Sequence, residues 1–88
     1  MAKMEAGVVY GEKYQELLQS CKDGGYALPA VNVVGSNSIN AVMEAAAKNE
    51  SDIIVQLSNG GAQFMAGQGM ADGDAAKVIG AVAAANHV

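Results

Sequence analysis

Two short apolar segments separated by an amphipathic segment are the feature that most limits what this chain can fold into. Residues 26–34 are almost continuously apolar, and residues 53–57 form a second run rich in β-branched side chains. Such runs are typical of parallel strands that are covered on both faces. Between them, from Ile39 to Ala47, apolar residues recur with helical spacing. This order predicts a right-handed βαβ unit with parallel strands.

The same spacing predicts two further helices outside this unit. One covers residues 12–22 and ends at Gly24-Gly25, because glycine adopts the left-handed C-terminal geometry without steric cost. The other begins at about Ala75, with Asp72 or Asp74 as its N-cap.

Loops are expected on either side of the second strand. Residues 35–38 offer several N-caps and are expected to be a loop before the middle helix. Ser58-Asn59-Gly60-Gly61 ends the second strand, and the stretch after it, rich in glycine and methionine, predicts a second loop.

These elements do not make a complete fold. The chain has 88 residues, enough for one small domain, and no internal boundary is visible. A parallel sheet of two strands leaves both edges open, so Val31, Val33, Ile54 and Val55 are expected to keep exposed faces. The last helical pattern is still periodic at Val88. We therefore expect residues 1–88 to be the N-terminal portion of a larger α/β domain, interrupted in the helix after strand two.

Composition excludes several classes of function. The formal net charge is −4 and no basic cluster occurs, which argues against binding to nucleic acid. No apolar run is long enough to cross a membrane, and residues 1–6 lack the apolar core of a secretory signal. The single cysteine, Cys21, rules out an internal disulfide and a cysteine zinc cage, and is expected to be buried. We expect a cytoplasmic protein.

Polar residues at the ends of the two strands are the best candidates for a binding site. Ligands of parallel α/β proteins bind at the carboxyl ends of the strands. Strand one ends near Asn32, and strand two ends at Ser58, so both side chains are expected on one rim. Gln56 lies inside strand two, and Gly60-Gly61 would let a ligand approach the backbone. The alternative is that these residues only terminate strands and form a turn.

The other candidates have simpler explanations. Gly67-Gln68-Gly69 lacks the third glycine of a dinucleotide site and the lysine of a phosphate loop. His87 is the only histidine, and a metal site needs about three or four ligands. Asp72 and Asp74 resemble a pair of catalytic carboxylates, but N-capping of the last helix explains both. The residues alone supply no catalytic acid, base or nucleophile, and no metal site.

Four segments of the sequence resemble the start of class II, metal-dependent fructose-bisphosphate aldolases. Their order and spacing are kept, and Ser58-Asn59-Gly60-Gly61-Ala62 with Ala66-Gly67-Gln68-Gly69 resembles the dimeric fructose-bisphosphate subgroup. The segments are Ala27–Val33, Ser38–Ala46, Ile53–Ala62 and Ala66–Gly69.

This resemblance implies a fold and an activity. The fold is a (β/α)8 TIM barrel, of which the chain would supply the first two βα units and a preceding helix. The activity is reversible cleavage of fructose 1,6-bisphosphate to dihydroxyacetone phosphate and glyceraldehyde 3-phosphate, a lyase reaction of glycolysis and gluconeogenesis. A zinc ion held by histidines polarises the ketone. The parent enzyme is expected to be a homodimer.

The resemblance also assigns roles to single residues. Asn32 and Ser58 match residues that contact the dihydroxyacetone phosphate half of the substrate, and Gln56 matches a glutamine near the site. Asn59, Gly60 and Gly61 are possible supports for it. The family's catalytic aspartate and zinc histidines belong to later strands, so we expect no zinc ligand among these residues and no activity from this chain alone. The alternative is a non-enzymatic product that acts as a binding or scaffold piece.

Overall fold

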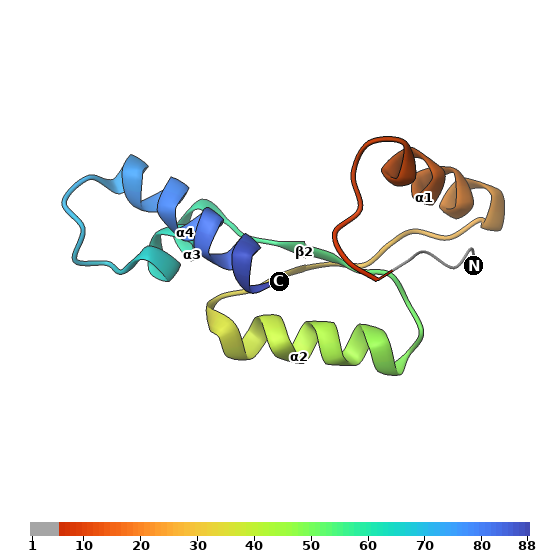
Figure 1. Cartoon of the computed structure of the whole chain (residues 1–88). Coiled ribbons are helices and arrows are strands. Elements are labelled where there is room, and N and C mark those ends of the chain that lie inside the picture. Colours follow the sequence, from red (N-terminus) through yellow and green to blue (C-terminus); the bar gives the residue numbers. More distant parts are fainter. Residues whose placement is uncertain (1–5) are drawn as a thin grey trace.

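A computed structural model describes residues 6–88 as four helices and a two-stranded sheet (Figure 1). Residues 1–5, which carry most of the segment expected not to be a secretory signal, lie outside the described residues. None of the helices among the described residues combines the length and apolar character that crossing a membrane requires. The elements are α1 (Gly11–Gly24), β1 (Ala30–Asn32), α2 (Gly35–Lys48), β2 (Ile54–Gln56), α3 (Asn59–Ala66) and α4 (Gly73–His87).

The predicted βαβ unit is confirmed. β1 and β2 are parallel neighbours joined by α2, and Asn32 stands opposite Gln56. The ladder continues past the strands, since Ile54 N–H donates to Pro29 C=O over 3.0 Å and Val33 N–H donates to Gln56 C=O over 2.9 Å. Both strands are shorter than expected because a strand extends only where a neighbour pairs with it.

The first helix is confirmed, with its end where the glycine pair predicts it. α1 stops at Gly25, whose φ of 68° lies in the left-handed region that favours glycine. The expected loop over residues 35–38 is wrong, because α2 begins at Gly35. Its first turn is closed by Ser38, whose hydroxyl accepts from Val34 N–H over 2.8 Å and also bonds to Val34 C=O. These residues act inside the helix and do not cap it.

Two helices follow β2, where the sequence predicted a loop and one helix. α3 forms from glycine-rich residues because Ser58 caps it: the Ser58 hydroxyl oxygen accepts from Gly61 N–H over 3.0 Å. The sequence analysis therefore missed α3, and the helix expected from about Ala75 corresponds to α4.

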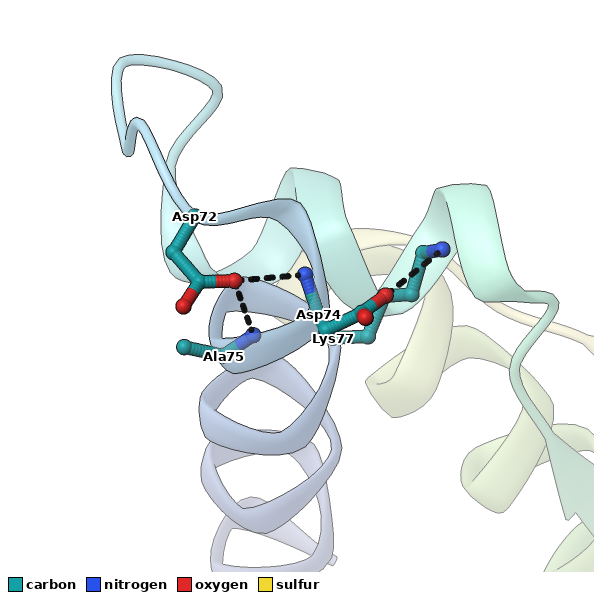
Figure 2. Close-up of polar contacts among 4 residues, drawn as sticks. All are labelled: Asp72, Asp74, Ala75 and Lys77. Carbon is teal, nitrogen blue, oxygen red and sulfur yellow. Dashed lines mark hydrogen bonds and ion pairs between the residues drawn. The ribbon is translucent and has the colours of Figure 1, made fainter.

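The N-cap expected for the last helix is confirmed. Asp72 Oδ1 accepts from the backbone N–H groups of Asp74 and Ala75, each over 3.1 Å (Figure 2). Asp74 lies in the first turn and approaches Lys77 Nζ at 3.7 Å. A carboxylate here satisfies free N–H groups and interacts favourably with the helix dipole.

The core lies where α2 and α4 cover the ends of the strands. Val33, Ile39 and Ala84 are each 1% exposed, and four half-buried apolar residues pack around them: Val42, Val55, Leu57 and Met65. The burial of Val33 is a correction to the sequence analysis. Val31 and Ile54 are exposed, as expected for a sheet that is covered incompletely.

α3 and α4 approach each other so closely that their backbones touch. A Cβ atom on Gly80 would lie 1.6 Å from the carbonyl oxygen of Ala62. The neighbouring positions on α4, Ala76 and Ala84, are also small and buried. This packing holds α3 in place against α4.

The end of the sheet where the strands begin carries a second group of polar side chains. Cys21 is buried, as expected, and the Tyr26 hydroxyl and Asp52 Oδ2 are buried without a hydrogen-bond partner among the described residues. Burial of the hydroxyl, with the Cys21 thiol and the Asp52 carboxylate nearby, raises the pKa of Tyr26 above its ordinary 10.0.

Candidate functional site

The carboxyl ends of β1 and β2 bring two amide side chains into contact. Asn32 and Gln56 are register partners, and Gln56 Nε2 donates to Asn32 Oδ1 over 2.5 Å. Both residues are exposed. Because they stand opposite each other and their side chains meet, both lie on the same face of the sheet.

This hydrogen bond fixes what Asn32 can offer to a ligand. Its oxygen already accepts from Gln56, and its Nδ2 group keeps two N–H donors for a ligand. Asn32 is therefore suited to bind an oxygen acceptor, such as a carbonyl, hydroxyl or phosphate oxygen.

Ser58 lies at the same end of the sheet, two residues beyond β2. Its oxygen accepts from Gly61 N–H, which leaves the hydroxyl hydrogen as a donor. Gly61 is buried, and a Cβ there would lie 3.4 Å from Val33 C=O, so the start of α3 packs against the end of β1. The structure thus joins Asn32 to Gln56, and it joins Ser58 to Gly61 rather than to either amide.

Asn59 and Gly60 form the exposed first turn of α3. The first N–H groups of a helix have no partner inside it, and they attract negatively charged or electron-rich groups. This turn therefore faces solvent at the end of the sheet where Asn32 and Ser58 lie.

Met65, which the sequence indicates only as a core filler, also makes a hydrogen bond in this region. Its sulfur accepts from Gly35 N–H over 3.1 Å, which links α3 to the first turn of α2. A methionine near other apolar residues is normally a core filler, and nothing in its sequence position indicates a hydrogen bond.

The weaker candidates lie elsewhere. Gly67, Gln68 and Gly69 belong to the exposed connection between α3 and α4. His87 is exposed near the end of α4, and its Nε2 lies 2.8 Å from Asn40 Oδ1 on α2. Within residues 6–88, no group of three or more His, Cys, Asp or Glu side chains is placed to hold a metal ion.

The comparisons with known proteins all point to the same family for this chain. Residues 12–88 match the family model for fructose-bisphosphate aldolase class-II. The chain is 52% identical over 86 residues to the fructose-bisphosphate aldolase of Edwardsiella ictaluri, and 47% identical over 87 residues to fructose-bisphosphate aldolase class 2 of Escherichia coli K12. In each case the match covers 97% of this chain and 24% of the relative.

A solved structure agrees with these relatives. The crystal structure of the fructose-bisphosphate aldolase from Campylobacter jejuni superposes with a TM-score of 0.86 at 48% identity. The match covers 94% of this chain and 23% of that protein, so the four helices and the parallel strand pair correspond to about a quarter of its length. The chain belongs to the class II fructose-bisphosphate aldolase family.

Proposed function

We propose that residues 1–88 act as the N-terminal, substrate-binding part of an enzyme that cleaves fructose 1,6-bisphosphate to dihydroxyacetone phosphate and glyceraldehyde 3-phosphate. The relatives that support this are named fructose-bisphosphate aldolases, and the chain spans about a quarter of their length. A complete (β/α)8 barrel, a homodimer and a cytoplasmic location are parts of the same proposal, and rest on the family resemblance.

The contact between Gln56 and Asn32 at the carboxyl end of the sheet is the observation that carries this proposal. Asn32 would donate from Nδ2, and Ser58 from its hydroxyl, to oxygen atoms of the phosphorylated sugar. Gln56 holds the Asn32 oxygen, so that the amide presents its donors. Asn59 and Gly60 expose N–H groups at the start of α3, which suits an electron-rich ligand.

The zinc ion of the family does not fit the residues described here. Within residues 6–88 no cluster could ligate it, and the one histidine, His87, bonds to Asn40 on the helical side of the sheet. We therefore assign no metal chemistry to this part of the fold. Its residues bind and orient the substrate.

The experiment uses a fusion enzyme, in which residues 1–88 of this chain replace the matching segment of the C. jejuni aldolase. Asn32→Ala should lower kcat/KM for fructose 1,6-bisphosphate by roughly 5- to 150-fold, because losing a polar contact that the bound substrate would bury costs about 1–3 kcal/mol. Asn32→Asp should also lower it, because a carboxylate keeps the acceptor for Gln56 but removes the donors.

Asn86→Ala is the matched control, because Asn86 is exposed near the far end of α4. It should leave kcat/KM unchanged. Full activity of both Asn32 variants, in protein that unfolds at the same temperature as the parent, would contradict the proposed role.

A further inference from the structure

We propose that Met65 is a site of reversible oxidation, at which hydrogen peroxide releases the start of α2 from α3. The thioether sulfur of Met65 caps α2 from the neighbouring helix, and its conversion to the sulfoxide breaks this contact. The oxidation and its effect on packing are independent of the proposed function. Only the effect on substrate binding, argued last, rests on that proposed function.

The Met65 sulfur supplies a hydrogen-bond partner that α2 does not supply for itself. Gly35 is the first residue of α2, and the first N–H groups of a helix have no partner inside the helix. The N-cap residue, Val34, makes no side-chain cap hydrogen bond. Gly35 N–H instead donates to Met65 Sγ over 3.1 Å, across 30 positions of the sequence. A side chain of α3 therefore caps α2.

Gly61 and Met65 together hold the junction between β1 and α2 against α3. They are four residues apart on α3, so they lie on the same face of that helix. An added Cβ at Gly61 would lie 3.4 Å from Val33 C=O and 3.3 Å from a methyl carbon of Val34, which shows how closely the backbones pack. Met65 adds a second contact, at Gly35. Of the two contacts, the thioether is the one that an oxidant can alter.

Oxidation changes Met65 at the atom that makes the contact. The sulfur attacks one oxygen of hydrogen peroxide, the O–O bond breaks and an S–O bond forms. Sulfur loses two electrons, and the second peroxide oxygen leaves as water. One sulfur lone pair is now used in the new bond, and the acceptor is an oxygen one bond further out. The 3.1 Å between Met65 Sγ and the Gly35 nitrogen leaves no room for that oxygen.

The surroundings of Met65 make a sulfoxide costly in the present packing. Met65 packs against the core cluster, in which Val33 and Ile39 are each 1% exposed. A polar sulfoxide among these side chains loses hydration without gaining hydrogen bonds. Met65 itself is half-buried, so its side chain is not sealed from solvent. We therefore expect the oxidant to reach the sulfur and the oxidised side chain to turn outward.

Release of this contact would reach the polar rim because β1 runs directly into α2. Asn32 ends β1, and two residues separate it from Gly35. Ser58 begins α3, the helix that carries Met65. When Met65 lets go of Gly35, the position of Asn32 relative to Ser58 is held at fewer points. Under the proposed function, the oxidised enzyme should therefore bind and orient its substrate less well.

The test treats the fusion enzyme with hydrogen peroxide and compares it with its Met65→Leu variant. Leucine keeps an apolar side chain of similar size and has no sulfur, while every other oxidisable group is shared. Peptide mass spectrometry should show one added oxygen atom at Met65. Peroxide should lower the unfolding temperature further in the parent fusion enzyme than in Met65→Leu.

The kinetic effect should follow the same difference. Peroxide should lower kcat/KM of the parent roughly 2- to 12-fold more than that of Met65→Leu, the range to which the net contribution of one hydrogen bond converts. Methionine sulfoxide reductases with a dithiol, which is oxidised to the disulfide, should restore both properties of the parent.

Met70→Leu is the matched control. Met70 is also half-buried, and it lies in the connection between α3 and α4. This variant keeps Met65, so it should remain as sensitive to peroxide as the parent.

Three results would overturn the inference. The first is oxidation of Met70 while Met65 stays unmodified. The second is oxidation of Met65 with unfolding temperatures that fall equally in the parent and in Met65→Leu. The third, decisive if Met65→Leu folds poorly, is a parent whose unfolding temperature does not recover although Met65 has been reduced again. A larger fall in the parent's unfolding temperature with unchanged kcat/KM would support the oxidation site and count against the substrate role of Asn32.

Discussion

We propose two tasks for the hydroxyl group of Ser58. Its oxygen caps α3 by accepting from Gly61 N–H, and its hydrogen is left for a ligand. In the fusion enzyme, Ser58→Ala should lower the free energy of unfolding by about 1 kcal/mol through the lost cap and should raise KM. Ser58→Thr keeps both tasks and should be close to the parent. Unfolding curves and steady-state kinetics measure the two effects, and an alanine variant with an unchanged KM would leave Ser58 as a cap only.

Tyr26 is expected to ionise at a higher pH than a tyrosine ordinarily does. Its pKa is raised above the ordinary 10.0, chiefly by burial of its hydroxyl. A tyrosine with a raised pKa favours the folded state below pH 10, and that contribution is lost as the pH rises through its folded pKa. Absorbance titration of the fusion enzyme should show a late phase that Tyr26→Phe removes. A Tyr26→Phe variant that keeps the late phase would contradict the burial of this hydroxyl.

The sequence was sufficient to place Asn32 and Ser58 at one end of the sheet, because the carboxyl ends of neighbouring parallel strands lie at the same edge. It could not predict the bond from Gln56 to Asn32. That contact depends on register, and a shift of one residue would turn Gln56 to the other face. The bond from Gly35 N–H to the Met65 sulfur was equally hidden, since it joins residues that only the packing of α3 brings together.

At the scale of whole elements, α3 shows where sequence patterns fail. Gly60 and Gly61 have poor helix propensity, so the sequence predicts a loop where α3 forms. The cap at Ser58 and the close packing on α4 outweigh that propensity. The helices at residues 12–22 and after Asp72 were predictable because their periodicity, caps and stop signals agree.

The contact between α3 and α4 makes Gly80 intolerant of any side chain. Gly80→Ala would place a Cβ 1.6 Å from the Ala62 carbonyl oxygen, so the two helices must separate. In the fusion enzyme this should cost roughly 1–3 kcal/mol of folding free energy, the usual scale of overpacking. Gly69→Ala is the control, because a Cβ at Gly69 meets nothing within 4 Å. Chemical denaturation compares them, and equal stability of the two variants would contradict the observed packing.

At the scale of the whole molecule, the described fold is more extended than an independent domain. Its radius of gyration is 14.7 Å, and its axes measure 46 × 25 × 20 Å. A compact domain of this length would have a radius of gyration of about 12 Å. The extended shape leaves apolar side chains exposed. They lie on the sheet at Val31 and Ile54 and on α4 at Val78 and Val82.

We therefore expect the isolated 88-residue chain not to unfold as a single cooperative unit. Ordering costs about 1–2 kcal/mol per residue, and a sheet with two open edges offsets little of this. Circular dichroism during heating should show a broad change, and sedimentation should show association. A monomer with one sharp thermal transition would contradict this expectation. The fusion enzyme, in which the sheet is completed, should unfold sharply.

The strands are only three residues long, yet they keep two groups of polar side chains apart. Asn32, Gln56 and Ser58 stand where the strands end, while Cys21, Tyr26 and Asp52 stand where they begin. Natural selection can therefore act on the two groups separately. Substitutions around Tyr26 can accumulate in a lineage and change the stability of the fold, with the polar rim at the carboxyl ends of the strands unchanged. Over evolutionary time, changes in stability and changes in the chemistry of that rim would then fall at separate sets of positions.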